Sequence, residues 1–371
     1  MKVLITGANG FIGRNLKVHL SERKDVEVIS FTRNDDLAEL PALINDVDFI
    51  FHLAGINRPN DPKEFLEGNT DLTRVLCDAI SAASRVIPII YTSSAQASQD
   101  NPYGLSKRLA ESLLLDLRRD TGSATHVFRL PNVFGKWSRP NYNSVVSTFC
   151  HNIVNNLPIQ INDPSALLTL VYVDDVVGRF IQLMDGAHSD LDAHGFEVIN
   201  PQYTISVGQL AQQLYTFKDS RSTLLTERVG TGLVRSLYST YLSYLPANLF
   251  SYAVPCHSDT RGVFVEMLKT PDSGQFSYFT AQPGITRGGH YHHTKTEKFL
   301  VIRGNARFKF RNMDSLEEFE MVTSAGVPTV VETVPGWAHD ITNIGEDEML
   351  VMLWANEIFD RNNPDTYASP L

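Results

Sequence analysis

The sequence predicts an α/β domain with a doubly wound parallel sheet, followed by an all-β domain of barrel or jelly-roll type. Short apolar runs at 1–6, 48–55 and 87–94 alternate with stretches of helical periodicity, as in parallel sheets covered by helices. From Phe250 onward, short strands of alternating polarity are separated by turn residues, the pattern of an antiparallel barrel. A chain of 371 residues is long enough for two such domains.

The composition indicates which kinds of partner and which cellular compartment to expect. The formal net charge is −10, with 43% hydrophobic and 20% charged residues, which is ordinary for a soluble protein and disfavours nucleic acid or an anionic membrane. The three cysteines, Cys77, Cys150 and Cys256, are too widely spaced to indicate disulfides or a cysteine-type zinc site. The chain starts directly with a strand, and no apolar run is long enough to span a bilayer. We therefore expect a cytoplasmic protein without a signal peptide.

A glycine loop follows the first predicted strand and precedes a helical stretch at 14–20. Gly7 permits a tight turn, Gly10 lets the backbone approach a pyrophosphate, and Gly13 lets helix and strand pack closely. The helix N-terminus supplies N–H groups for phosphates. This pattern predicts a dinucleotide site. Further predicted cofactor contacts are Phe11, Ile12, Leu53 and Ala54.

The end of the second predicted strand, 26–31, bears on the choice of cofactor. NAD-binding proteins usually place a carboxylate there for the ribose 2′-hydroxyl, whereas this chain has Phe31, Thr32 and Arg33. A cation suits a 2′-phosphate, so the sequence favours NADPH over NADH. Asp36 is expected near the adenine. The alternative is that Arg33 is a solvated surface residue.

Tyr103 and Lys107 are four residues apart, a spacing that on a helix places both side chains on one face. The ammonium of Lys107 is expected to lower the pKa of the Tyr103 phenol, which makes the phenol a usable proton donor near neutral pH. Ser94, at the carboxyl end of the 87–94 strand, can hydrogen-bond the same substrate oxygen.

Residues 1–245 resemble an extended short-chain dehydrogenase/reductase, a Rossmann-type fold, of the nucleotide-sugar type. The resemblance rests on segments 6–13, 52–55, 102–107, 129–135 and 172–176. It implies that Ser94, Tyr103 and Lys107 form the catalytic triad. It also implies a sugar-nucleotide pocket that includes Asn132, with Lys136 and Arg139 as candidate diphosphate contacts. These two cations could equally be solvated loop charges.

Three histidines and one glutamate in the second half form a candidate metal site. His290 and His292 are one residue apart on an extended segment, so their rings are expected on one side of a sheet. Glu297 begins the next predicted strand, and His339 follows a turn at 335–336. Such nitrogen and oxygen ligands suit Zn²⁺, Fe, Mn, Co or Ni. The alternative is a histidine-rich polar loop.

Residues 250–371 resemble a cupin domain. Gly284, His290, His292, Glu297 and Gly304 fit every position of the first cupin motif, and Gly336, His339 and Asn343 fit the second, whose proline is one place late at Pro335. Segment 259–266 also resembles nucleotide-sugar 3,5-epimerases, which implies that Arg261 holds substrate phosphate or orders the site. Zn²⁺ is the expected metal. The unassigned candidates for acid and base are His293, Lys298 and Asp340.

The order of the two domains resembles the bifunctional nucleotide-sugar epimerase/reductases of bacterial capsule and O-antigen synthesis, on the UDP-N-acetyl-L-fucosamine route. The resemblance implies a homodimer and two reactions. The cupin domain would epimerise C3 of a UDP-2-acetamido-2,6-dideoxy-4-hexulose. The first domain would then reduce C4 with NADPH to give UDP-2-acetamido-2,6-dideoxy-L-talose. Two alternatives remain open: a 4-epimerase that retains and recycles NAD, and a reductase whose cupin is a non-catalytic scaffold.

Overall fold

The computed structural model describes residues 1–293, 295–313, 315–362 and 364–371. The chain divides into two compact units. The first comprises Met1–Leu214 and Ser236–Leu245, and the second comprises Tyr215–Arg235 and Pro246–Leu371. Residues 215–235, which the sequence places in the first domain, therefore make most of their contacts within the second unit. The functional division into 1–245 and 250–371 stays a prediction.

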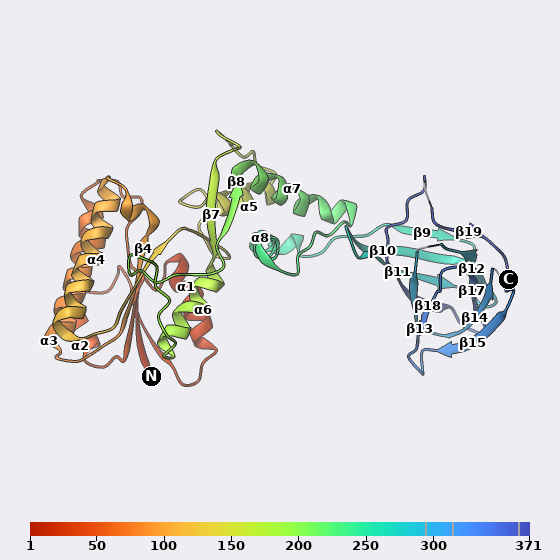
Figure 1. Ribbon diagram of the computed structural model, residues 1–371, viewed down its shortest axis with the longest axis horizontal. Helices are drawn as coiled ribbons and strands as arrows, with labels where there is room; N and C mark the ends of the chain where they lie inside the picture. The colour runs from red at the N-terminus through yellow and green to blue at the C-terminus, as the bar shows by residue number, and fades with distance from the viewer. Residues whose placement is uncertain (294, 314, 363) are drawn as a thin grey trace. The chain divides into compact units, whose positions relative to one another are not determined.

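The first unit is built on a five-stranded sheet of order β2-β1-β3-β4-β5 in which all paired strands are parallel. This confirms the predicted doubly wound sheet. Helices α1 and α6 cover one face, and α2, α3 and α4 cover the other (Figure 1). The elements, in chain order, are β1 (Lys2–Thr6), α1 (Phe11–Ser21), β2 (Glu27–Phe31), η1 (Leu37–Glu39), α2 (Leu40–Ile44), β3 (Phe49–His52), η2 (Leu66–Asp71), α3 (Leu72–Ala82), β4 (Ile89–Ser94), η3 (Ala95–Ser98), α4 (Pro102–Thr121) and β5 (Thr125–Leu130).

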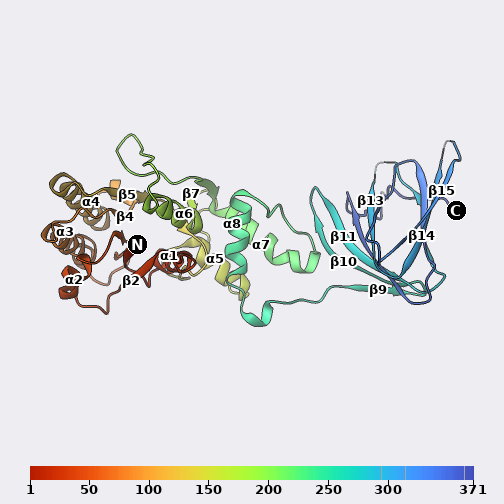
Figure 2. The same ribbon diagram turned by 90° about the horizontal axis from the view of Figure 1, so that it is seen from below.

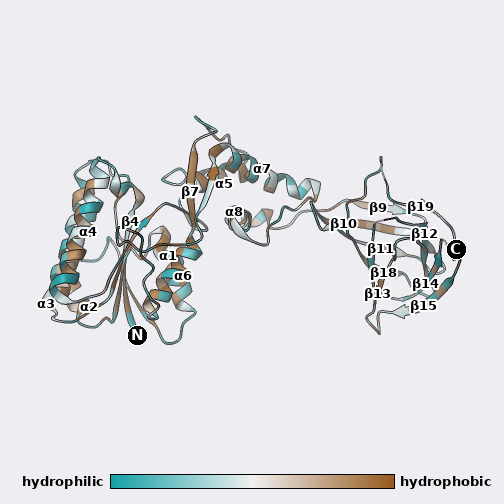
Figure 3. Cartoon of the chain, viewed as in Figure 1, coloured by the Kyte–Doolittle hydropathy of each residue, from teal (hydrophilic) through white to brown (hydrophobic). Residues whose placement is uncertain are grey.

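Strand alternation explains how one apolar run serves two cores. Val3 and Ile5 of β1 pack in the core shared with α1 and α6, whereas Leu4 packs in the core shared with α2, α3 and α4. Successive side chains of a strand point to opposite faces, so a strand buried on both faces must be apolar throughout. Figure 3 shows these strands as hydrophobic and the helices as amphipathic.

The part of the first unit that follows β5 in the chain contributes α6 to the cover of the parallel sheet and forms a second, smaller sheet. A small sheet of order β6-β7-β8 pairs β6 with β7 in parallel and β7 with β8 antiparallel. The elements after β5 are β6 (Asn132–Phe134), α5 (Val145–Val154), β7 (Leu167–Tyr172), α6 (Val173–Met184), β8 (Tyr203–Ser206), α7 (Val207–Thr223), α8 (Gly232–Leu242) and η4 (Ala247–Leu249). Helix α7 begins in the first unit and ends in the second, α8 begins in the second and ends in the first, and η4 lies in the second.

The second unit is an antiparallel β-structure of two facing sheets, which confirms the predicted all-β domain (Figure 2). The sheets have the orders β16-β13-β18-β11-β10-β9 and β15-β14-β17-β12-β19. Between them lies a core that includes Phe279, Phe299, Phe308 and Ile341. The strands are β9 (Cys256–Asp259), β10 (Gly262–Thr270), β11 (Gly274–Ala281), β12 (Thr286–Tyr291), β13 (Glu297–Arg303), β14 (Asn305–Asn312), β15 (Glu318–Ser324), β16 (Val330–Glu332), β17 (Trp337–Asn343), β18 (Met349–Ala355) and β19 (Tyr367–Ala368).

Among the helices that the structure describes, none combines the length and the hydrophobicity needed to cross a membrane.

Candidate functional site

A cleft of about 800 Å³ in the first unit brings together residues from the glycine loop, from the carboxyl ends of the parallel strands and from the start of α4. In open α/β sheets, ligands bind at this edge. The volume is within the range of small-molecule sites. The predicted site residues that line it are Gly7, Gly10, Phe11, Ile12, Gly13, Leu53, Ser94, Tyr103, Lys107, Asn132 and Arg139.

The glycine loop is packed too tightly for side chains. Gly7 has φ +71°, and a Cβ atom there would lie 2.7 Å from the backbone nitrogen of Ala54. A Cβ atom on Gly13 would lie 2.4 Å from the carbonyl oxygen of Gly7. Gly10 caps α1 without a side-chain hydrogen bond, which leaves the first N–H groups of the helix for an anion. The loop therefore has the shape and the donors that a pyrophosphate needs.

Ser94 and Tyr103 meet across the cleft because α4 starts close to the end of β4. Asn101 caps α4 by accepting a hydrogen bond from the N–H of Gly104 at 2.8 Å, with Pro102 in the first helical turn. Burial raises the pKa of Tyr103, and a hydrogen bond with Ser94 opposes this rise. The ring of Phe65, whose centre is 5.4 Å from that of Tyr103, lines the same cleft.

Lys107 is a buried residue of α4, one helical turn after Tyr103. Its Nζ donates to the carbonyl oxygen of Thr92 at 3.0 Å and lies 4.9 Å from the centre of the Tyr91 ring. Burial lowers the pKa of Lys107 to about 8, while the carboxylate of Glu111 raises it. The expected lowering of the Tyr103 pKa by Lys107 is not seen, since burial dominates at the phenol and the net shift is upward.

Asn69, which the sequence analysis did not single out, joins the helix that carries Tyr103 and Lys107 to a loop of the cleft. Its Oδ1 accepts from the N–H of Ile56 at 2.9 Å, and its Nδ2 donates to the carbonyl of Ile56 and to Ser106 Oγ. The Ser106 hydroxyl in turn donates to the carbonyl of Tyr103 at 2.8 Å. Asn69 lies in the π-helical turn η2, and such turns recur at functional sites. No pattern in the sequence indicates these partners.

Four predicted contacts of the first unit lie outside the residues that line the cleft: Arg33, Asp36, Ala54 and Lys136. Arg33 is exposed, and Asp36 caps η1 by accepting from the N–H of Ala38. The ammonium of Lys136 lies 2.5 Å from Asp174 Oδ1. The structure thus gives no support to Lys136 as a diphosphate contact, because its charge is already neutralised by a carboxylate.

Two predicted substrate contacts do line the cleft. The guanidinium of Arg139 lies 5.2 Å from the centre of the Tyr142 ring, which also lines the cleft. Asn132 donates from Nδ2 to the carbonyl of Thr169 at 3.2 Å. In the second unit, Arg261 is exposed and forms a two-point ion pair with Asp259, so an incoming phosphate would compete with that carboxylate.

In the second unit, the side-chain ligand atoms of His290, His292, Glu297 and His339 all lie within 4.8 Å of one another. Strand pairing explains this: β12 and β17 place His290 opposite His339, and the register shift that allows it falls at Gly288 and Gly289, which both have positive φ. Such a bulge re-aims a side chain. The four residues that the cupin motifs align are therefore together in space.

The polar atoms of this cluster fit a cation at their centre. The Nδ1 of His292 lies 2.5 Å from the carbonyl oxygen of Asp365 and donates to it, and its Nε2 lies 3.2 Å from Glu297 Oε2. Neither ring nitrogen of the buried His339 has a hydrogen-bond partner among the described residues, and its Nε2 lies 3.3 Å from the same oxygen. Polar atoms that converge in this way are satisfied when a metal ion or a proton lies between them.

The charge state of the cluster also suits a metal. Burial, assisted by His339, lowers the pKa of His290 to about 4, so its ring is neutral at pH 7. Burial alone would raise the pKa of Glu297, but contacts with His292 and His339 and the charge of Lys295 lower it overall. A neutral imidazole and an ionised carboxylate are protonation states that metal ligands require.

The candidates for acid and base differ in position. His293 is exposed and packs edge-on against Tyr291 and Tyr367. Lys298 is exposed and paired with Glu332. Asp340 is buried, but it follows His339 on the strand and so points to the opposite face of the sheet.

Lys295 is a buried cation that the sequence analysis missed. Its Nζ lies 3.0 Å from Glu297 Oε1, and the only sequence signal was its two-residue spacing from Glu297. The structure therefore leaves the acid and base unassigned and places a fixed positive charge next to the ligand carboxylate.

The comparisons with known proteins agree with this architecture. Residues 3–198 match the NAD dependent epimerase/dehydratase family, and residues 257–367 match the polysaccharide biosynthesis C-terminal domain. A UDP-2-acetamido-2,6-beta-L-arabino-hexul-4-ose reductase from Pseudomonas aeruginosa is 64% identical over 368 residues, which cover 99% of this chain and 98% of the relative. The chain belongs to this nucleotide-sugar epimerase/reductase family. As a member it is an oxidoreductase of polysaccharide biosynthesis that uses a nicotinamide cofactor.

Solved structures of the epimerase/reductase family have the same fold over the full length. The crystal structure of the capsular polysaccharide assembling protein CapF from Staphylococcus aureus is 41% identical, with a TM-score of 0.92 over 100% of both chains. A second CapF structure, with the inhibitor 3-isopropenyl-tropolone, is 37% identical with a TM-score of 0.87 over 100% of both chains. The UDP-glucose 4-epimerase of Thermotoga maritima, at 18% identity and a TM-score of 0.54, covers 66% of this chain and 98% of its own and shares the fold of that part alone.

Proposed function

We propose that this protein is a bifunctional enzyme that epimerises C3 of a UDP-2-acetamido-2,6-dideoxy-4-hexulose and then reduces C4 with NADPH. The product would be UDP-2-acetamido-2,6-dideoxy-L-talose. The observation that carries the proposal is that one chain holds a cleft with Ser94, Tyr103 and Lys107 and, in a separate unit, a buried cluster of three histidines and a glutamate. The relative from Pseudomonas aeruginosa is named as a reductase of a UDP-linked 4-keto sugar, which supports the substrate class.

In the reduction, each residue of the triad has a role that its position allows. The nicotinamide cofactor supplies the hydride that C4 receives. Tyr103 gives its phenolic proton to the oxygen formed at C4, and Ser94, within hydrogen-bond reach of Tyr103, orients the carbonyl beforehand. Lys107 donates a hydrogen bond to the carbonyl of Thr92 and would bind the ribose of the cofactor. Its positive charge favours the phenolate form of Tyr103 as the proton leaves.

The choice of NADPH rests on Arg33, which is exposed after the end of β2. That strand ends without an acidic residue for a ribose 2′-hydroxyl, so a 2′-phosphate meets a cation rather than a carboxylate. On the substrate side, Asn132 and Arg139 line the cleft, and the guanidinium of Arg139 can take a diphosphate oxygen.

In the epimerisation, His290, His292, Glu297 and His339 would hold one divalent ion, and zinc suits this ligand set. Such an ion would supply Lewis-acid stabilisation of the negative charge that develops when a proton leaves the carbon next to a ketone. The chain contributes the fixed ligand geometry: the carbonyl of Asp365 orients His292, and Lys295 holds one oxygen of Glu297. Arg261 is the proposed phosphate contact of this unit. A homodimer stays a prediction from the resemblance.

The test incubates the full-length protein with the UDP-4-keto sugar and NADPH in deuterated water and determines the product by NMR. We expect deuterium at C3 and one NADPH oxidised for each product formed. Tyr103→Phe should exchange C3 but lose reduction by about 100-fold or more. His339→Ala should lose the C3 label while still binding NADPH. Product formation without net NADPH oxidation would instead show an epimerase that recycles NAD, and unchanged product stereochemistry in His339→Ala would show a scaffold role for the second unit.

A further inference from the structure

Glu111 is a buried carboxylate on the helix that carries Tyr103 and Lys107. It follows Lys107 by four residues and Tyr103 by eight in α4, so all three side chains lie along one face of the helix. Its side chain is 6% exposed. A buried carboxylate is costly unless it is paired, which directs attention to its partners.

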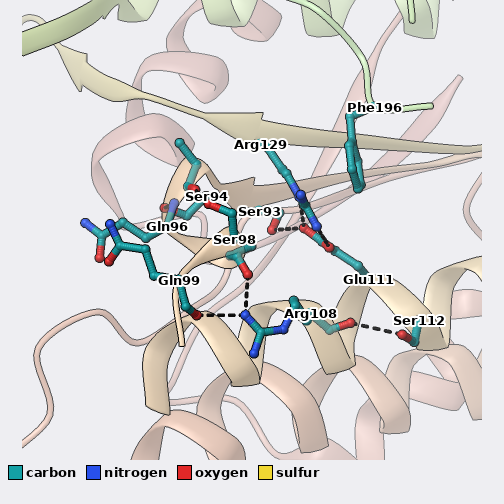
Figure 4. Close-up of polar contacts among 12 residues, drawn as sticks. Ser93, Ser94, Gln96, Ser98, Gln99, Arg108, Glu111, Ser112, Arg129 and Phe196 are labelled. Atoms are coloured by element: carbon teal, nitrogen blue, oxygen red, sulfur yellow. Dashed lines mark hydrogen bonds and ion pairs between the residues drawn. The ribbon is translucent and has the colours of Figure 1, made fainter. Parts of the chain in front are cut away.

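Both oxygens of Glu111 are occupied by partners from the sheet (Figure 4). Ser93 Oγ donates to Oε1 at 2.5 Å, and Arg129 donates from Nε to Oε1 at 3.0 Å and from Nη2 to Oε2 at 2.7 Å. Ser93 and Arg129 are register partners on β4 and β5. The face of the Arg129 guanidinium lies 4.0 Å from the centre of the Phe196 ring. One carboxylate thus ties α4 to two adjacent strands through charge-assisted hydrogen bonds, which are the strong ones.

This tie lies next to the meeting point of the triad. Ser93 immediately precedes Ser94, and successive residues of a strand point to opposite faces. The side chain of Ser94 can reach Tyr103 in the cleft while that of Ser93 binds Glu111 behind it. Because Ser94 and Tyr103 come from different elements, their spacing depends on how closely α4 is held to the end of β4. Glu111 supplies such a hold through its contact with Ser93 at 2.5 Å, and Lys107 adds a contact with the carbonyl of Thr92 at 3.0 Å.

Glu111 also faces Lys107 as a charge. The other titratable groups around the ammonium are Tyr91 and His52 from the sheet and Tyr103 from its own helix. Burial raises the pKa of Tyr91 well above its ordinary value, and burial together with Lys107 lowers the pKa of His52 to about 3, so both are neutral at pH 7. The carboxylate of Glu111 raises the pKa of Lys107 against the effect of burial. Glu111 therefore favours the charged form of Lys107.

We propose that Glu111 is a positioning residue of the reduction: it fixes the spacing between the strand end with Ser94 and the helix with Tyr103, and its charge keeps Lys107 an ammonium. This inference rests on the proposed reductase function. The carboxylate does not line the cleft, so it acts through its neighbours rather than on the substrate. If the ion pair between Glu111 and Arg129 were purely structural, breaking it would lower the stability of the protein and leave the rate of reduction of the folded protein unchanged.

The experiment compares Glu111→Gln with a matched control, Glu197→Gln, in the full-length protein. Glu197 is also a buried carboxylate of the first unit, paired with His126 at 2.7 Å and Arg179 at 3.1 Å, and 1% exposed. The rate of NADPH oxidation is measured from pH 6 to pH 10. Activity that needs the Lys107 ammonium is lost as the pH rises through the Lys107 pKa of about 8. In Glu111→Gln this alkaline limb should move to lower pH by about one unit, since an adjacent opposite charge is lost.

In the same variant, kcat should fall about tenfold or more, with KM for the keto sugar changed less than about threefold. In Glu197→Gln, kcat and the limb should match the wild type. Glu111→Asp keeps the charge at a shorter reach, so the limb should stay in place while kcat falls. Ser93→Ala removes the hydrogen bond to Glu111 without changing the charge, so here too kcat should fall while the alkaline limb stays in place. These two variants decide the matter if Glu111→Gln does not fold: wild-type kcat in both overturns the inference.

An unshifted limb in a folded Glu111→Gln variant, with kcat like that of Glu197→Gln, also overturns it. Failure of the proposed function would look different, because the wild type itself would then oxidise no NADPH with a 4-keto sugar. In that case the pH dependence of the NADPH dissociation constant is the readout. Binding that weakens at lower pH in Glu111→Gln than in the wild type supports the inference, and identical curves overturn it.

Discussion

Replacing Glu297 by glutamine tests the metal centre, and the structure sets the size of the effect. Glu297 Oε1 lies 3.0 Å from Lys295 Nζ, and the two side chains are 6% and 8% exposed. Removing one member of a buried ion pair costs about 3–5 kcal/mol, because the remaining charge stays buried without a partner. The amide oxygen of glutamine can still accept a hydrogen bond from Lys295. We therefore expect a loss of about 3 kcal/mol in the free energy of unfolding, at the lower end of that range.

Zinc should increase the difference in the free energy of unfolding between the wild type and Glu297→Gln. Glutamine replaces an anionic ligand with a neutral one, and we expect the affinity for zinc to fall by at least about 100-fold. A hundredfold loss in affinity removes about 2.7 kcal/mol of the stabilisation that bound metal provides. The gap between the wild type and Glu297→Gln should therefore be about 3 kcal/mol in chelator and about 6 kcal/mol in zinc.

The assay is urea unfolding of the full-length protein, followed by tryptophan fluorescence in a Trp137→Phe background. The chain has three tryptophans, and the two that remain, Trp337 and Trp354, lie on β17 and β18 of the second unit. The matched control is Glu348→Gln, which breaks an ion pair with Arg303 whose members are 34% and 60% exposed. Such a pair contributes about 0–1 kcal/mol.

The reasoning is refuted if Glu297→Gln costs no more than Glu348→Gln in chelator. It is also refuted if zinc stabilises both variants equally, because a carboxylate that does not bind the metal cannot change its affinity.

Two further predictions concern the first unit. Gly7→Ala should cost more than about 2 kcal/mol and weaken NADPH binding at least about tenfold, since its Cβ would lie 2.7 Å from Ala54. Gly122→Ala, with φ +77° and open space around its Cβ, should cost only about 1 kcal/mol in thermal unfolding. For Glu197, burial would raise the pKa, but hydrogen bonds, chiefly from His126, lower it to about 2. Because the pKa of Glu197 is lower in the folded than in the unfolded protein, the ionised carboxylate stabilises the fold above its ordinary pKa, and this stabilisation is lost as the pH falls through the folded pKa. The urea midpoints of the wild type and Glu197→Gln should therefore converge between pH 5 and pH 2.

The parts of the fold and site that the sequence predicted are those encoded locally. The glycine loop follows β1 directly, and Tyr103 and Lys107 share a helix face through their spacing. His290 and His292 share a side of an extended segment, and the structure brings His339 and Glu297 to them. Short periodicities determine which face a side chain occupies, and glycines mark where the backbone must turn or approach closely.

The sequence could not supply the partners that topology brings from elsewhere. Lys136 is paired with Asp174 rather than turned to the cleft, and their 38-residue separation leaves no local signal. Lys295 is buried against Glu297, although lysine is usually exposed. Glu111 acquires its role only because β4 and β5 bring Ser93 and Arg129 together. Ion pairs of this kind are set by three-dimensional packing, so no pattern in the sequence indicates them.

The hydrogen bond from His292 to the carbonyl of Asp365 has a consequence for the order in which the protein matures. The residues that line the nucleotide cleft end at Ser144, so a ribosome has made all of them before it reaches any residue of the histidine cluster. The histidine cluster waits for Asp365 and for β19, which pairs with β12 beside His290. During translation, the residues that line the cleft are therefore made before those of the histidine cluster, and the hydrogen bond that orients His292 can form only after Asp365 has been made.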